Sequence, residues 1–284
     1  MATRALDSGA FYASDGATYD PSELTRGPWD PGSQHAGPPC ALLAGELDRA
    51  GEIRQARVAR ITFEILRPVP IAPLRMSAGV VRPGRSVELV EGVLSQDDTE
   101  ILRARAWRIR MEAVEVDGPQ PDEQPMPGPD AAEPRDFFPT GHDLGYHSAM
   151  EARFLAGSYV EPGPARAWMR QRVPLVEGCE TSPLERLLVA ADSGNGVSAP
   201  LDYDRFVFIN TDLSVALRRL PRGDWIGLDS ISHAEPDGIG LTDTALHDGH
   251  GPLGRVTQSL LIARRSTGPP RGPGRTPPGG APRR

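Results

Sequence analysis

The sequence contains no lysine, only two cysteines and no long run of apolar residues. Cys40 and Cys179 are too few for a disulfide framework and lie in or near apolar segments, so we expect two buried free thiols in a reducing compartment. A membrane-spanning helix needs about 18 consecutive apolar residues, and an N-terminal secretory signal needs a shorter apolar stretch. Neither is found. We therefore predict a cytoplasmic protein that does not insert into membranes.

The charge balance argues against nucleic acid as a partner. The 31 basic residues, all arginine, are outnumbered by 38 acidic residues, and the net charge is −7. Nucleic acids are bound by clustered positive charge, which this balance does not supply. Arginine does offer bidentate contacts to individual phosphate groups.

The motifs of several enzyme classes are missing as well. There is no Gly-x-Ser-x-Gly elbow, and the glycines at 194, 196, 238 and 240 form neither a P-loop nor a dinucleotide fingerprint. His247 and His250 fall in a predicted hairpin turn and lack the further ligands of a zinc site. We therefore predict no cofactor and no metal, and neither nucleotide hydrolysis nor hydride transfer.

The most informative feature that the sequence does contain is a repeat. Residues 57–110 and 206–264 each have the alternation and turn spacing of four β-strands. Arg67 and Arg218, each with a proline three residues later, occupy matching positions 218 − 67 = 151 residues apart. Each run of strands follows one apolar helix, predicted at 39–50 and 183–191.

A helix wrapped by a curved antiparallel sheet, occurring twice, is the α+β layout of a double hotdog fold. Two such sheets in one chain are expected to fuse edge to edge, with a site where the copies meet. We expect an N-terminal repeat at 10–112, a Pro-rich acidic linker at 113–136 that is too polar to pack by itself, and a C-terminal repeat at 137–265 that carries the site. A disordered Pro/Gly/Arg tail is expected at 266–284.

Asp192 interrupts the apolar pattern of the second helix. It lies four residues after Leu188, on the same apolar stripe, and near the helix C-terminus, where the helix dipole disfavours negative charge. Partial burial would raise its pKa toward the range of a general base. The structural alternative is a carboxylate that only hydrogen-bonds the backbone of the turn at 193–196.

Gln258 interrupts the apolar face of the last strand, which it shares with Val256, Leu260 and Ile262. The matching residue of the first repeat is Ala106 (258 − 152 = 106). A buried amide without partners costs about 1–3 kcal/mol. Gln258 is therefore expected either to orient a water or a substrate carbonyl, or to bridge to a backbone group.

The first strand of the second repeat carries a polar run from Asn210 to Ser214. Alternation with a period of two places Asn210 on the face opposite Val207 and Ile209, and places Thr211 on the apolar face. Each of these polar residues, taken singly, also suits a solvated sheet surface.

Together these segments resemble the acyl-CoA thioesterase II-like proteins, in the double-hotdog branch common in actinobacteria. The resemblance extends over about residues 10–265, without the linker. In the first half it is carried by Gln-His-Ala-Gly-Pro-Pro at 34–39, Phe-Glu-Ile-Leu-Arg-Pro-Val-Pro at 63–70 and Val-Arg-Pro-Gly-Arg at 81–85. In the second half it is carried by Ala-Ala-Asp-Ser-Gly-Asn at 190–195, Asn-Thr-Asp-Leu-Ser at 210–214 and Arg-Val-Thr-Gln at 255–258.

The resemblance implies an active site made of an Asp from the second helix, a Thr or Ser from the following strand and a Gln from the last strand. The Asp and the Gln match Asp192 and Gln258. Asn210 stands where the family often has Thr, with Thr211 beside it, so this chain departs from the family pattern there.

The implied reaction is direct hydrolysis of an acyl thioester of coenzyme A or acyl carrier protein, in fatty acid metabolism. Asp192 would take a proton from a water held by Gln258 and by Asn210 or Thr211. Backbone N–H groups near Gly37 would stabilise the oxyanion. The resemblance also implies a homo-oligomer, such as a dimer of double units paired through their sheets.

Two other functions are compatible with the sequence. A hotdog-fold hydratase or dehydratase would use a His with an Asp or Glu, and His35 is the only histidine near a helix start, where it also suits a structural cap. A non-catalytic acyl-thioester-binding protein would account for the departure at Asn210.

Overall fold

The computed structural model of the protein describes residues 9–118 and 124–265. The helices in these ranges are α1 (Gly37–Ala50), α2 (Tyr146–Ala149), α3 (Pro183–Ala191) and α4 (Gly194–Val197), with 3-10 turns η1 (Glu23–Thr25) and η2 (Pro129–Ala131). The strands are β1 (Tyr12–Ser14), β2 (Tyr19–Pro21), β3 (Ala56–Ile65), β4 (Arg75–Arg82), β5 (Val87–Gln96), β6 (Thr99–Arg110), β7 (Glu133–Pro134), β8 (Met150–Ala156), β9 (Ala165–Gln171), β10 (Phe206–Asn210), β11 (Asp212–Leu217), β12 (Ile226–Ala234), β13 (Ile239–Asp248) and β14 (Gly251–Arg264).

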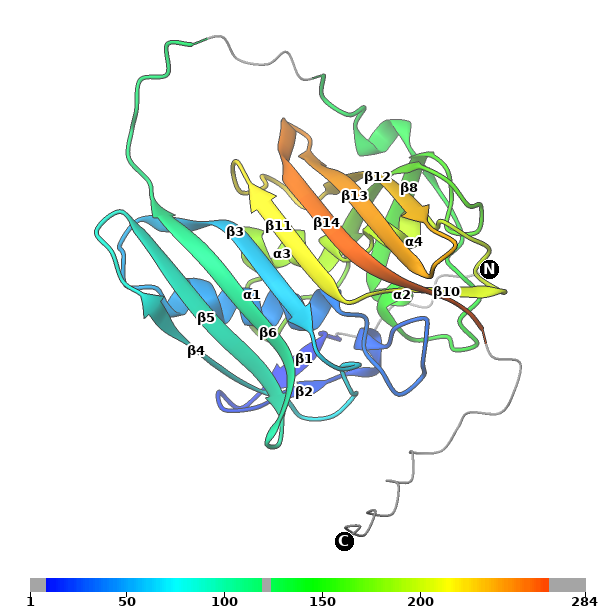
Figure 1. The fold of residues 1–284 in the computed structure, drawn as a ribbon, viewed down its shortest axis with the longest axis horizontal. Helices are drawn as coiled ribbons and strands as arrows, with labels where there is room; N and C mark the ends of the chain where they lie inside the picture. The colour runs from blue at the N-terminus through cyan, green and yellow to red at the C-terminus, as the bar shows by residue number, and fades with distance from the viewer. Residues whose placement is uncertain (1–8, 119–123, 266–284) are drawn as a thin grey trace, which may run out of the picture.

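A twelve-stranded antiparallel sheet extends through both repeats in the described part of the chain (Figure 1). Its order is β4-β5-β6-β3-β11-β14-β13-β12-β9-β8-β7, and β10 also pairs with β14. The two repeats meet where β3 pairs with β11, with Phe63 opposite Leu213 and Ile61 opposite Val215. We call this pairing the seam. The predicted α+β double hotdog fold, with two sheets fused edge to edge, is confirmed.

Helices α1 and α3 lie against the same face of the sheet and pack on each other (Figure 1). They approach so closely that a Cβ atom on Gly37 would lie 2.4 Å from the backbone oxygen of Val189. Helix α3 has the predicted bounds because Ser182 and Glu185 form a reciprocal capping box ahead of Pro183. Asp192 is the C-cap of this helix, and its carboxylate lies 3.1 Å from His35, just before the start of α1.

The first strand of the second repeat is interrupted by a β-bulge. Asn210 pairs with Leu260 and Ser214 pairs with Thr257, so five residues on one strand lie opposite four on the other. The extra residue reverses which side chains face inward. Phe208 and Asn210 share a side by regular alternation, but beyond the bulge Leu213 and Val215 are the buried residues, and Thr211 is exposed. The prediction that Thr211 belongs to the apolar face was therefore wrong.

Three further features differ from expectation or add to it. Cys40 is buried as predicted, but Cys179 is exposed. The end of the predicted linker packs on the sheet, because Met126 contacts Trp168, whose indole N–H donates to the backbone oxygen of Pro127 at 2.7 Å. Strands β8 and β9 were not predicted. The expected disordered tail at 266–284 lies outside the described residues.

Of the helices in the described ranges, none combines the length and the apolarity that crossing a bilayer requires.

Candidate active site

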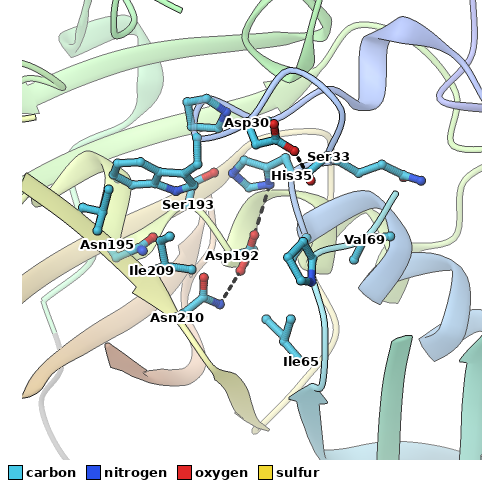
Figure 2. Close-up of a pocket in the computed structure, with 18 of the residues that line it drawn as sticks. Asp30, Ser33, His35, Ile65, Val69, Asp192, Ser193, Asn195, Ile209 and Asn210 are labelled. Carbon is cyan, nitrogen blue, oxygen red and sulfur yellow. Dashed lines mark hydrogen bonds and ion pairs between the residues drawn. The ribbon is translucent and has the colours of Figure 1, made fainter. Parts of the chain in front are cut away.

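A cavity of about 480 Å³ lies at the seam between the two repeats (Figure 2). The first repeat contributes residues of 27–36 and 65–69, and the second contributes Asp192 and its neighbours together with residues 207–211. We expected a site where the copies meet, with Asp192, Gln258, Asn210 and Thr211 from the C-terminal repeat and Gly37 and His35 from the N-terminal repeat. The N-terminal repeat lines it as well, because the edge-to-edge fusion brings the loop before α1 against the end of α3.

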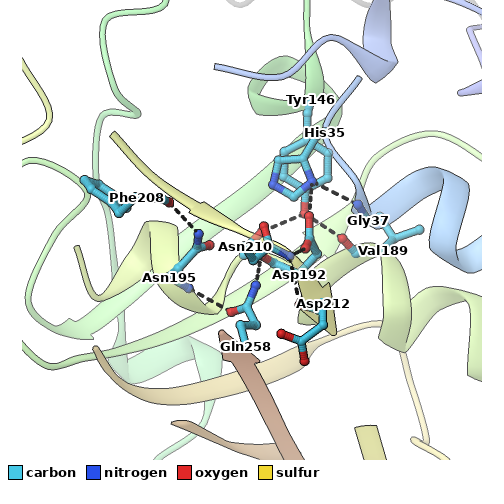
Figure 3. A network of polar contacts seen from close by, with 11 residues as sticks. His35, Gly37, Tyr146, Val189, Asp192, Asn195, Phe208, Asn210, Asp212 and Gln258 are labelled. Carbon is cyan, nitrogen blue, oxygen red and sulfur yellow. Dashed lines mark hydrogen bonds and ion pairs between the residues drawn. The ribbon is translucent and has the colours of Figure 1, made fainter. Parts of the chain in front are cut away.

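The carboxylate of Asp192 borders this cavity and is held from both sides (Figure 3). Its Oδ1 accepts a hydrogen bond from Asn210 Nδ2 at 2.9 Å, and its Oδ2 lies 3.1 Å from His35 Nδ1. The residue is 4% exposed. The carboxylate thus contacts side chains from both repeats, unlike the alternative in which it only caps the following turn.

His35 is the residue of the first repeat that reaches Asp192. Burial lowers the pKa of the imidazole, although the charge of Asp192 opposes this effect. Its Nδ1 lies 3.1 Å from Asp192 Oδ2 and also accepts the Gly37 N–H at 3.1 Å. A ring nitrogen carries either a hydrogen or a lone pair. When Asp192 is ionised, Nδ1 must therefore carry the hydrogen and donate it to the carboxylate. Nδ1 then no longer accepts the hydrogen bond from the Gly37 N–H.

Tyr146 fixes the orientation of the His35 ring. The two rings are stacked, with centroids 3.7 Å apart and planes 7° apart. The Tyr146 hydroxyl donates to the backbone oxygen of Val189 at 2.7 Å and lies 2.9 Å from Ser193 Oγ. Tyr146 belongs to none of the recognised segments, and Ser193 lies in the segment at 190–195 but was not assigned a role.

Gln258 approaches Asp192 through the backbone and not through the cavity. Its Oε1 accepts the N–H of Asn195 at 3.1 Å, and its Nε2 donates to the backbone oxygen of Asp192 at 3.2 Å (Figure 3). The side chain is fully buried, and it is absent from the described residues that line the cavity. Gln258 therefore supports the turn between α3 and α4, as the structural alternative for this residue states.

The remaining predicted site residues are Asn210, Thr211 and Gly37, and they differ in whether they contact Asp192 and the cavity. Asn210 lines the cavity and contacts Asp192 directly. Thr211 lines the cavity too, but its hydroxyl lies 3.4 Å from the backbone oxygen of Ser259. The N–H of Gly37, expected to bind an oxyanion, is bonded to His35 in this arrangement.

Cys40 lies in the first turn of α1 and is fully buried. Burial raises the pKa of its thiol, and the charge of Asp192 raises it further. The described residues that line the cavity do not include Cys40.

The fold and the site define a double hotdog protein with a buried carboxylate at the seam of its two repeats. The sequence profile of the acyl-CoA thioesterase N-terminal domain matches residues 25–109, and that of the acyl-CoA thioesterase C-terminal domain matches residues 119–262. The chain belongs to the acyl-CoA thioesterase family, and its activity is the hydrolysis of acyl thioesters.

Solved structures agree on the fold. A proposed thioesterase II from Thermobifida fusca superposes with a TM-score of 0.71 at 18% identity, covering 89% of this chain and 95% of its own. For an acyl-CoA thioesterase II from Mycobacterium marinum the TM-score is 0.60 at 17% identity, with 93% and 98% covered. A hot dog fold protein from Alicyclobacillus acidocaldarius gives 0.65 at 15% identity, with 90% and 96% covered. No curated protein sequence matches the chain.

Proposed function

We propose that Asp192 is the general base of this thioesterase and that the attacking nucleophile is water. The observation that carries the proposal is the position of its carboxylate, which borders the cavity while His35 and Asn210 hold its two oxygens. Each oxygen keeps a lone pair beyond these contacts. A carboxylate held in this way can accept a proton from a water without first reorienting.

The hydrolysis then has two steps. Water attacks the thioester carbon as its proton passes to Asp192, forming a tetrahedral oxyanion. The intermediate breaks its C–S bond, and the thiolate takes the proton back from Asp192, which leaves a carboxylic acid and a free thiol. His35 Nδ1–H donates to the ionised Asp192 and so keeps its Oδ2 in place.

Asn210 and Gln258 have different parts in this proposal. Asn210 orients the carboxylate through its Nδ2 and takes the place of the family's hydroxyl residue. Gln258 is a positioning residue, since both ends of its amide hold the backbone around Asp192. Thr211 borders the entrance, where it can contact the substrate.

A thiol-release assay over a series of acyl-CoA chain lengths tests the function. We expect stoichiometric thiol and free acid. The His35–Asp192 pair would also suit a thioester hydratase, so an enoyl-CoA substrate belongs in the series. Addition of water without thiol release would favour the hydratase, and binding without any turnover would favour a non-catalytic binder.

The finer features are proposals of the same kind. We propose repeats at 10–112 and 137–265, a homodimer in solution, and a cytoplasmic role in fatty acid metabolism, for which the free thiols Cys40 and Cys179 are suitable. The proposed carrier is coenzyme A, with exposed Arg67 at the rim of the cavity as a candidate phosphate contact. Acyl carrier protein is the alternative, and comparing the two thioesters as substrates separates them.

A further inference from the structure

The cavity at the seam has an exposed end and a buried end. At the exposed end, Leu66 is 50% accessible, and Arg67 and Thr211 are also exposed. At the buried end, Phe138 is 4% accessible and Tyr159 2%. A thioester substrate carries a large polar carrier and an acyl group. The carrier therefore belongs at the exposed end and the acyl group at the buried end.

Helix α4 connects the reactive carboxylate to the buried end. It begins two residues after Asp192, and both Asn195 and Gly196 line the cavity. A Cβ atom on Gly196 would lie 3.8 Å from Cε2 of Phe138. An acyl chain bound with its carbonyl near Asp192 would therefore run along α4 toward Phe138.

Three aromatic rings close that end, and we call them the aromatic wall: Phe137, Phe138 and Tyr159. Their centroids lie 4.5 Å apart for Phe137 and Tyr159, 5.2 Å for Phe137 and Phe138, and 5.5 Å for Phe138 and Tyr159. Phe138 also stacks on Tyr203 at 4.2 Å. Rings packed at these distances hold one another in place.

A second cavity of about 420 Å³ lies behind the wall. Among the described residues, Phe137 and Tyr159 are the two that line both cavities. The second cavity is otherwise bordered by several charged side chains, including Arg135, Glu151 and Arg153. These two rings are therefore the partition between an apolar space next to Asp192 and further space that the acyl chain cannot reach.

We propose that the aromatic wall is the length limit for the acyl group, so that the enzyme selects short-chain and medium-chain acyl thioesters. This inference rests on the proposed site at Asp192. The first cavity lies in the lower half of the range of about 300–1,000 Å³ that ligand sites occupy. It must also hold the thioester and the end of the carrier arm, so the acyl chain has only part of its volume. Phe137 is the residue to change, because it is only half-buried.

The test is a chain-length series of acyl-CoA substrates with Phe137→Ala and Phe137→Trp. Phe137→Ala removes a ring of the partition, so its preferred chain is longer, with kcat/KM gaining at most about fourfold for each methylene that enters the space vacated by the ring. Phe137→Trp fills the buried end, and the preferred chain becomes shorter. Phe206→Ala is the matched control. Phe206 is half-buried in the same repeat and borders neither cavity, so its length profile stays that of the wild type.

Ratios between chain lengths, and not absolute rates, decide the outcome. Active Phe137 variants with the wild-type ratios would overturn the length limit and leave the role of Asp192 intact. Calorimetric binding of the same series to the Phe137 variants in an Asp192→Asn background reads the length limit without turnover. Affinity that rises with chain length only in Phe137→Ala supports the limit even if Asp192 proves not to be the base, and equal profiles contradict it.

Discussion

Replacing Gln258 with leucine separates a structural role of this amide from a direct role in catalysis. In the structure, the Gln258 side chain accepts the N–H of Asn195 and donates to the backbone oxygen of Asp192. Leucine has a similar volume but no polar atoms. The variant therefore leaves two buried backbone groups without partners in the turn that positions the general base.

The expected cost follows from these two groups. Each buried donor or acceptor left unsatisfied costs about 1–3 kcal/mol, so Gln258→Leu should lower the free energy of unfolding by about 2–6 kcal/mol. A domain is stable by only about 5–15 kcal/mol in total. Activity should fall as well, because the backbone of Asp192 loses its support.

Urea unfolding and acyl-CoA hydrolysis, measured on the same preparations, test this expectation. The control is Ser259→Ala, which changes the adjacent exposed side chain of β14 and should alter stability by less than about 0.5 kcal/mol. Full stability of Gln258→Leu together with a large loss of kcat would refute the structural role. That result would mean that Gln258 acts on water or substrate directly.

Three further predictions concern the charges around the site and in the first repeat. Asn210→Asp places a second carboxylate beside Asp192 Oδ1, so repulsion raises the pKa of the pair and moves the acid limb of the kcat/KM profile to higher pH. Asn210→Thr, which has the family's residue type, should leave that limb in place. The same acid limb in both variants would argue against the contact between residue 210 and Asp192. Burial lowers the pKa of His35, so the contribution of this residue to stability is complete above about pH 6.5 and is lost as the pH falls further. The urea midpoint of His35→Gln should therefore decline less than that of the wild type between pH 7.5 and 5.5. Parallel declines in the two proteins would contradict this. In the first repeat, Arg108→Met leaves the buried Glu88 without its guanidinium partner, so the free energy of unfolding in urea should fall by about 3 kcal/mol. An unchanged urea midpoint would contradict the stabilising role of this buried ion pair.

The sequence was most informative where a local rule was either fully obeyed or clearly broken. Helix α3 could be bounded to the residue because proline opens it and its apolar stripe ends at Asp192. Asp192 and Gln258 stood out because each is polar at an apolar position, and the structure brings both to the end of α3. The resemblance to acyl-CoA thioesterases, drawn from six short segments, is confirmed by the family profiles.

What could not be predicted depends on contacts between distant segments. The stacking of His35 on Tyr146 joins the loop before α1 to a four-residue helix with no motif of its own. The bulge at Thr211 reverses the alternation on which the assignment of faces relied, and a bulge has no signature in this polar run. Gln258 could be recognised as unusual, but its two backbone partners could not be foreseen from periodicity.

The most direct test of the account is the hydrolysis of acyl-CoA by Asp192→Asn. Asparagine preserves the shape of the side chain, so thermal unfolding should remain close to that of the wild type. Because a general base contributes about 10²–10⁴-fold, kcat should fall by that factor. A folded Asp192→Asn variant whose kcat stays within about tenfold of the wild type would contradict the assignment of this carboxylate as the base.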